Sequence, residues 1–277
     1  MREPRDRPGE IALVEGSVPP GVGLMELIAE SDVVFYMAGT STPESANLDP
    51  GASIANHIVP AAAVLDLMCS TPTRRIVVAS SGGTVYGAAT EFPTPEDHPT
   101  RPISLHGHHS LTIERYARFF AERHGFEPVI LRYSNPYGPG QLARRGQGVI
   151  AAWSQALARG EPLRIFGDPA TRRDFIYIDD LVSATVDAGL IAPADTYNVG
   201  SGEASSLEEV IELLTSAAGL EGAQVVRVGE RGVDVPMTQL ECGRLSGVID
   251  WTPRVALPEG IRASLDWMRE LPYRRGN

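Results

Sequence analysis

The sequence predicts an α/β fold in which a parallel sheet is wrapped by helices and carries a smaller C-terminal lobe. Short β-branched runs alternate with longer amphipathic runs through the first half of the 277-residue chain, a rhythm typical of strand–helix–strand crossovers. The runs at 32–37, 75–80 and 128–132 are apolar on both faces, as strands inside a parallel sheet are. Beyond Tyr133, loops rich in Pro, Gly and Arg separate shorter elements. This change indicates a lobe over the carboxyl edge of the sheet, where ligands of open α/β folds bind.

The first half supplies the elements of the sheet. Apolar residues recur at helical spacing from Ile54 to Met68 and again from Leu111 to Phe120. The expected order is strand 11–14, helix 24–30, strand 32–37, helix 54–68, strand 75–80, helix 111–120 and strand 128–132.

The second half supplies the lobe and the end of the sheet. Ser205 or Ser206 is the expected cap of one helix, because Glu208 and Glu209 follow in its first turn. The expected elements are helices at 148–159, 179–190, 206–218 and 258–269 and strands at 163–166 and near Tyr197. We therefore divide the chain into an incomplete sheet domain over 1–145, to which 174–200 returns, and a mainly substrate-binding lobe over 146–277.

Composition narrows the partners and the compartment. The chain has 24 basic and 35 acidic residues, a net charge of −11, so nucleic acid is not an expected partner and an anionic ligand must be held by a few placed arginines. Cys69 and Cys242 are both expected inside apolar, helix-like segments and do not suggest a disulfide framework. No apolar run approaches the roughly 18 to 20 residues that span a bilayer, and the start does not look like a signal peptide. We expect a soluble cytoplasmic protein.

Five strings along the chain carry a family resemblance. They are DVVFYMAG (32–39), SSGGTVYG (80–87), LRYSNPYGPGQ (131–141), RDFIYIDDL (173–181) and YNVGSGE (197–203). In this order and spacing they resemble the extended short-chain dehydrogenase/reductase family, in its NAD-dependent epimerase/dehydratase branch that acts on nucleotide sugars. The resemblance implies a Rossmann-like sheet, NAD(P) as cofactor and a nucleotide diphosphate sugar as ligand.

The first departure from that family is at the cofactor end. The family opens with a strand, a Gly-rich turn and a helix whose N-terminus takes the pyrophosphate. Here 11–14 resembles the family's third strand, and only ten residues precede it. The fragment Gly21-Val22-Gly23 has Glu26 at the third glycine position and is interpreted as a plain loop. We predict a sheet without its first βαβ unit and weak or lost NAD(P) binding. The cofactor positions that the resemblance leaves are Ala38, Gly39, Asn56, Ser80 and Tyr133.

The missing unit has a consequence for the sheet. In the strand order 3-2-1-4-5-6, the absent strands would lie between the one at 11–14 and the one at 32–37. The strand at 32–37 would then have an exposed apolar edge, which is an aggregation hazard. Three outcomes are open: the 11–14 segment pairs beside it, a partner chain covers it, or translation begins upstream of Met1.

The second departure is in the catalytic residues. The family uses a Tyr as acid/base and a Lys four residues later, with a Ser or Thr that bonds the same substrate hydroxyl. His106 and Ser110 stand at the Tyr and Lys positions, and Gly82 at the Ser/Thr position. Ser81 and Thr84 are near enough to donate a hydrogen bond instead. Ser110 has no charge, whereas His106 could act as a base near neutral pH.

The substrate side of the family motif is retained. Arg173 and Arg231 match the arginines that clamp the diphosphate, since a guanidinium binds phosphate oxygens bidentately. An ion pair of Arg173 with Asp174 or Asp180 is the alternative. The resemblance assigns the remaining substrate positions as follows: Asp234 to the nucleoside, Asn135, Gln147 and Val149 to the border of the diphosphate, and Tyr86 to the sugar pocket, where buried packing is an equal alternative.

Two other chemistries are not expected. His106, His108 and His109, even with Glu96, Asp97 and His98 nearby, do not share one helix face, so no metal site is predicted. Ser80 and Ser81 lack the Gly-x-Ser-x-Gly elbow of a serine hydrolase.

Three hypotheses for function remain. The first is a nucleotide-sugar-binding protein that is impaired in ordinary redox epimerisation, a pseudoenzyme. The second is a redox-neutral isomerase or lyase that uses His106 as base. The third is a non-catalytic interaction subunit whose sheet is completed by a partner. A homodimer is plausible by resemblance, because the helix that follows His106 keeps Leu111, Tyr116 and Phe119.

Overall fold

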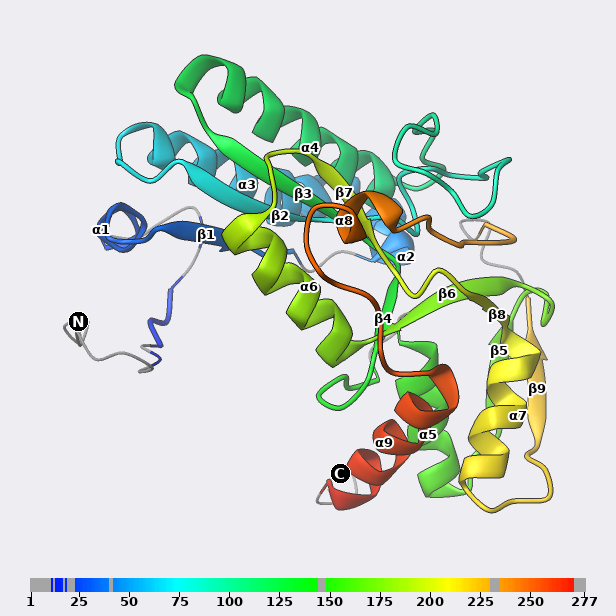
Figure 1. The fold of residues 1–277 in the computed structure, drawn as a ribbon. Helices are drawn as coiled ribbons and strands as arrows, with labels where there is room; N and C mark the ends of the chain where they lie inside the picture. Colours follow the sequence, from blue (N-terminus) through cyan, green and yellow to red (C-terminus); the bar gives the residue numbers. More distant parts are fainter. Residues whose placement is uncertain are drawn as a thin grey trace.

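A computed structural model describes residues 11, 13–16, 18, 23–39, 42–143, 148–229 and 235–271. Figure 1 shows an upper layer built around a sheet and a lower lobe that contains the C-terminal helix. The sheet contains β1 (Val33–Tyr36), β2 (Arg75–Ser81), β3 (Glu127–Tyr133) and β7 (Thr196–Val199), all parallel and adjacent in that order. This is the expected α/β sheet.

Each face of the sheet has its own helices because side chains alternate along each strand. Ile76 and Val78 of β2 pack in one core cluster with α3 (Pro50–Cys69) and α4 (Leu105–His124). Val77 points the other way, into a cluster with α6 (Ile178–Ile191). Figure 1 shows α3 and α4 behind the sheet and α6 in front of it.

The lower lobe contains two small sheets and three helices. One sheet has the order β4 (Asn135–Tyr137), β6 (Arg172–Tyr177), β8 (Ala204–Ser206), and the other pairs β5 (Leu163–Phe166) with β9 (Val225–Val228). The helices are α5 (Val149–Arg159), α7 (Leu207–Ala217) and α9 (Leu257–Glu270). Their inward faces form a separate core cluster with residues of β4, β5 and β6. Ser206 caps α7 in a reciprocal capping box with Glu209, so of the two expected caps Ser206 is the one used.

The described residues also form three short helices: α1 (Leu24–Ala29), α2 (Pro43–Leu48) and α8 (Gly243–Ser246). Of these helices, α1 was predicted from the sequence, whereas α2 and α8 were not. The prediction that Cys242 lies inside a helix is wrong, because Cys242 is the residue that precedes α8. Cys69 and Cys242 are both free thiols.

The expected strand at 11–14 is absent. Residues 11, 13 and 14 are not in a strand, and the side chains of Ile11, Leu13 and Val14 are 97%, 84% and 56% exposed. Among the described residues no strand pairs with the free side of β1, so the segment does not re-pair there. Phe35 and Met37 are 40% and 46% exposed at this edge. Among the described residues the sheet therefore ends at β1.

Helix α3 contradicts the prediction that no apolar run is long enough to span a bilayer. The 20 residues of α3 are long and apolar enough to cross a membrane by length and composition. In the structure Val64, Leu65 and Met68 of this helix are buried in the core against the sheet.

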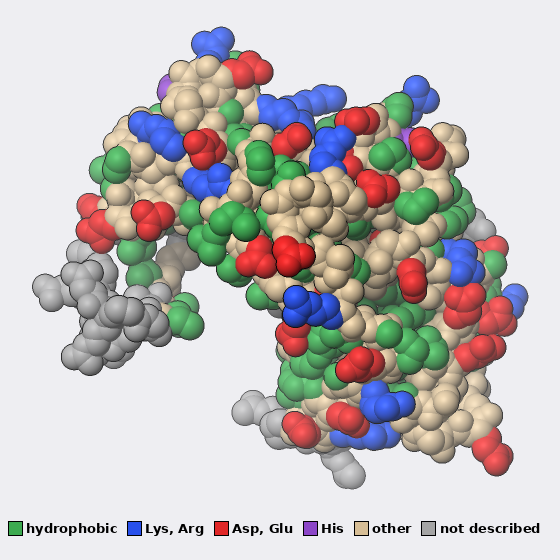
Figure 2. Space-filling view, viewed as in Figure 1, with side chains coloured by type: hydrophobic (Ala, Val, Ile, Leu, Met, Phe, Trp, Pro, Cys, Tyr) green, Lys and Arg blue, Asp and Glu red, His purple; other side chains and the backbone are tan. Residues whose placement is uncertain are grey.

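On the face seen in Figure 2, basic and acidic side chains are interspersed.

Candidate functional site

The first turn of α4 lies directly on the loop that follows β2. An added Cβ at Gly107 would be 2.7 Å from the carbonyl oxygen of Thr84 and 2.8 Å from Cβ of Pro102. Only glycine allows this approach, because such contacts are far shorter than van der Waals separation. His106, one residue earlier in α4, is therefore close along the chain to this contact, and Ser81 is the last residue of β2, just before the loop that carries Thr84. The backbone segments that carry the three catalytic candidates thus meet at the start of α4.

The side chains at this place differ in their partners. The hydroxyl of Thr84 is buried and has no hydrogen-bond partner within the protein. Ser110 Oγ donates to the carbonyl oxygen of His106 at 3.1 Å, so Ser110 braces the helix turn. Gly82, the Ser/Thr position, has Leu240 Cδ1 2.6 Å and the Arg132 carbonyl oxygen 3.0 Å from where a Cβ would lie. Leu240 occupies the space that a hydroxyl-bearing side chain would need.

Asn135 is at the start of β4, where the chain leaves the sheet and enters the lobe. Its amide nitrogen Nδ2 is buried without a partner in the protein and is 4.0 Å from the ideal Cβ position of Gly83. A buried donor that has no acceptor costs about 1–3 kcal/mol. The arrangement is therefore suited to an acceptor oxygen that comes from outside the chain.

Arg173 is in β6, the central strand of the sheet to which Asn135 belongs. Its guanidinium donates to the carbonyl oxygen of Arg172 at 2.9 Å and is half-buried. Val149 is the first residue of α5 and is also half-buried. Gln147, Arg231 and Asp234 lie outside the described residues.

The acids of the alternative ion pair have other partners. Asp174 is fully buried and accepts from the backbone nitrogens of Ser201, Gly202 and Leu240 and from Ser201 Oγ. Burial raises the pKa of Asp174, and these hydrogen bonds oppose the rise. Asp180 accepts from the backbone nitrogens at 254 and 255. Asp174 thus joins two loops to β6, and Asp180 joins the segment before α9 to the first turn of α6.

Tyr86 belongs to a buried polar network instead of an open surface. It is 3% exposed, and its hydroxyl donates to Asn198 Oδ1 at 2.7 Å and accepts from Arg132 at 3.0 Å. Arg132 makes two hydrogen bonds to Glu114, at 2.7 and 3.0 Å, and Ser80 Oγ donates to the same carboxylate at 2.5 Å. Burial raises the pKa of Tyr86 to about 12, so the hydroxyl keeps its proton. The geometry favours the packing alternative for Tyr86.

The remaining cofactor candidates are divided between surface and interior. Ala38 and Gly39 are exposed after the end of β1, and Asn56 is exposed on α3. The hydroxyl of Tyr133 is 2.9 Å from Thr185 Oγ1. Ser80, as described above, is bound to Glu114.

Sequence reasoning missed three features. His57 of α3 makes a ring contact with His106, although the two residues are far apart in the chain. Phe166 is an exposed aromatic at the end of β5, paired with Val228 just before the 230–234 segment that contains Arg231 and Asp234. The third feature was available from composition: all 24 basic residues are arginine. No other segment of this chain can therefore supply the missing lysine.

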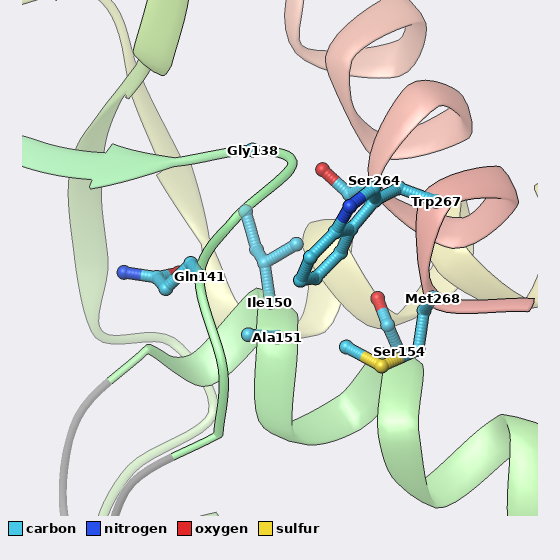
Figure 3. A pocket seen from close by; sticks show the side chains of 8 residues that line it. All are labelled: Gly138, Gln141, Ile150, Ala151, Ser154, Ser264, Trp267 and Met268. Atoms are coloured by element: carbon cyan, nitrogen blue, oxygen red, sulfur yellow. The ribbon is translucent and has the colours of Figure 1, made fainter. Parts of the chain in front are cut away.

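A crevice between α5 and α9 borders this region but has no space for a water molecule. Figure 3 shows Trp267 and Met268 of α9 facing Ile150 and Ser154 of α5 across it. Gly138 and Gln141 close its other end, in the loop that follows β4. We interpret the crevice as a packing defect of the lobe and not as the ligand site.

Comparison with known proteins settles the family. The model of the NAD-dependent epimerase/dehydratase family matches residues 2–200. UDP-glucose 4-epimerase of Mycolicibacterium smegmatis is 31% identical over 251 residues, which are 89% of this chain and 79% of that protein. The chain is a member of the NAD-dependent epimerase/dehydratase family. Within the extended short-chain dehydrogenase/reductases it is similar to nucleotide-sugar epimerases.

Solved epimerase structures share its Rossmann-like sheet. The Thermotoga maritima UDP-glucose 4-epimerase with UDP-glucose has a TM-score of 0.84 at 28% identity, and the match covers 89% of this chain and 82% of that one. The Thermus thermophilus UDP-glucose 4-epimerase with NAD has a TM-score of 0.83 at 28% identity, with 87% and 78% covered.

The described residues of this epimerase/dehydratase homologue do not fit NAD in the usual way. The pyrophosphate of a dinucleotide is held at a Gly-rich turn between a strand and a helix. Among the residues that the structure describes, no such unit lies beside β1, and Ser80 and Tyr133 are bonded within the protein. We therefore derive no catalytic step through NAD.

Proposed function

We propose that the chain binds a nucleotide diphosphate sugar where the sheet meets the lobe, with Asn135 and Arg173 on the diphosphate. The unpartnered, buried amide of Asn135 beside Gly83 carries this proposal. Arg173 supplies positive charge from the same small sheet in a chain whose net charge is −11. The Thermotoga maritima UDP-glucose 4-epimerase, which is 28% identical to this chain, was solved with UDP-glucose.

Phe166 extends this proposed site toward the base. It is 37% exposed at the end of β5, and its partner Val228 in β9 precedes residues 230–234 in the chain, where the family resemblance assigns Asp234 to the nucleoside. We assign the nucleoside to this end of the site and the sugar to the end near His106.

Ordinary redox epimerisation is impaired in this proposal. Ser110 replaces the lysine, no lysine exists elsewhere in the chain, and Leu240 fills the space beside Gly82. The described residues also lack a phosphate-binding turn for NAD, so cofactor binding is weak or lost.

A second candidate is a redox-neutral isomerisation or elimination with His106 as base. The observation that favours it is the position of His106, partly exposed and next to the Thr84 loop. An imidazole nitrogen of His106 would take a proton from substrate carbon and return it to another substrate atom, so no electrons are exchanged with a cofactor. His106→Ala would then abolish turnover and leave sugar-nucleotide affinity unchanged.

Two proposals concern assembly. The outer faces of α3 and α4 expose Ile54, Val59, Tyr116 and Phe119, each by 40–49%, which supports a homodimer through these helices. The open edge of β1 supports the alternative of a non-catalytic subunit that is completed by a partner. Sedimentation of the purified chain separates them, because a homodimer forms without any other protein.

Calorimetric titration tests the main proposal. UDP-glucose should bind in the absence of NAD, and Asn135→Ala should weaken it about tenfold or more. Added NAD should give little or no heat. Absence of UDP-glucose and dTDP-glucose binding would refute the proposal, and tight NAD binding would refute the cofactor part of it.

A further inference from the structure

Three histidine rings form a row between α3 and α4. The ring centroid of His57 is 5.4 Å from that of His106, in an edge-to-face arrangement, and 6.1 Å from that of His109. His108 is exposed on the outer side of α4. The row therefore combines two histidines of one helix with a third from another helix that the spacing along α4 does not reveal.

Close contacts hold His57 in this row. It is 8% exposed, and an added Cβ at Gly39 would lie 2.6 Å from its Cε1 and 2.7 Å from its Nδ1. Only a residue without a side chain allows the ring to lie there, at the end of β1. His109 closes the row on the interior side, with Nδ1 3.0 Å from Ser53 Oγ. The ring of His57 is thus fixed by the end of β1 and by α4.

The surroundings of His57 disfavour its charged form. Desolvation lowers the pKa of His57, and the charge of His109 lowers it further. The pKa of His109 is lowered by its own burial and then by His108. Among the contacts that the structure describes, His106 and His109 of α4 face His57, and uncharged Gly39, which follows β1, lies beside its ring. A neutral imidazole can stabilise a proton on a neighbouring ring, which a charged one would repel.

We propose that His57 is a positioning residue for His106, holding that ring beside the Thr84 loop and stabilising its protonated form. The inference rests on the proposed second function, in which His106 accepts a proton. His57 itself touches no substrate in this scheme.

The test is a pH titration of histidine rings by NMR in the full chain without ligand. Replacing His57 by leucine fills the space of the ring with an apolar side chain of similar size. This change should lower the pH at which His106 titrates by about half a unit or more. His57→Gln keeps a neutral polar group and should restore most of the shift. His124→Ala, which changes an exposed histidine at the far end of the same helix, is the matched control and should leave His106 unchanged.

The outcomes separate this inference from the proposed function. An unchanged His106 titration in folded His57→Leu protein would overturn the positioning role, and so would an equal shift in His124→Ala. A parallel titration with UDP-glucose tests the binding proposal alone. If UDP-glucose fails to bind while the His57 variants still shift His106, the proposed function fails and the histidine pair stands. If turnover is found, His57→Leu should lower kcat about tenfold or more and leave KM unchanged.

Discussion

Gly107 shows how one missing side chain shapes the site. A Cβ at this position would be 2.7 Å from the carbonyl oxygen of Thr84, a backbone atom that cannot move aside easily. We expect Gly107→Ala to destabilise the fold by about 1–3 kcal/mol, because overpacking forces the α4 turn away from the Thr84 loop. Chemical denaturation measures this loss. Gly222→Ala is the control, since nothing lies within 4 Å of that position, and a loss of similar size there would contradict the argument.

His57 makes stability depend on pH. Its pKa in the folded chain is lowered from the ordinary value of 6.5, so below that pH the unfolded chain binds more protons than the folded one. The stabilising contribution is therefore complete above pH 6.5 and is lost as the pH falls through the lowered pKa. Thermal unfolding between pH 7.5 and 5 should show a drop in Tm that is smaller in His57→Leu. An equal drop in both proteins would argue against a buried neutral His57.

At the scale of elements, the ion pair of Glu114 and Arg132 joins α4 to β3. Both side chains are at most 4% exposed and their closest atoms are 2.7 Å apart. Glu114→Ala leaves Arg132 buried without its carboxylate, and we expect a loss of about 3–5 kcal/mol in the free energy of unfolding. The pair of Arg75 and Glu127 is the control, because Glu127 is 60% exposed and Glu127→Ala should cost less than about 1 kcal/mol. Similar losses in the two variants would contradict this account.

Elements with a strong local pattern could be predicted from the sequence. The strands β1, β2 and β3 and the helices α5, α6, α7 and α9 are where apolar periodicity and capping residues place them. The segment 11–14 has the same β-branched pattern but is not a strand, because a strand also needs a neighbour to which its backbone can bond. The short strands β4 and β8 were missed, since three residues carry too little periodicity.

Candidate site residues could be proposed from the sequence where one segment carries the family motif. Asn135 and Arg173 were chosen in this way, and Gly82 and Ser110 were recognised as departures from that motif. The contact of His57 with His106 depends on how α3 packs against α4, which no single window of sequence contains. Tyr86 is a similar case, because its hydroxyl partner Asn198 lies 112 residues further along the chain.

At the scale of the whole molecule, one face remains apolar and uncovered. Val182, Val186 and Leu190 follow one another along α6 at a spacing of four residues and are 49%, 43% and 61% exposed, near the open edge of β1. Such a surface favours association. Light scattering should show particle mass rising with concentration, and Leu190→Glu should reduce the rise. A constant monomer or dimer mass for both proteins would show that this face of α6 does not mediate association.

Binding of a nucleotide diphosphate by the lobe through Arg173 can be tested by one calorimetric comparison. Arg173→Ala should weaken UDP-glucose binding by about ten- to a hundredfold, as expected when a charge-assisted hydrogen bond to phosphate is lost. Arg172→Ala is the matched control, because its neighbouring guanidinium bonds Glu209 at 3.0 Å and should leave the affinity within about twofold. Equal affinities for wild type and Arg173→Ala, or no binding by the wild type, would contradict the account.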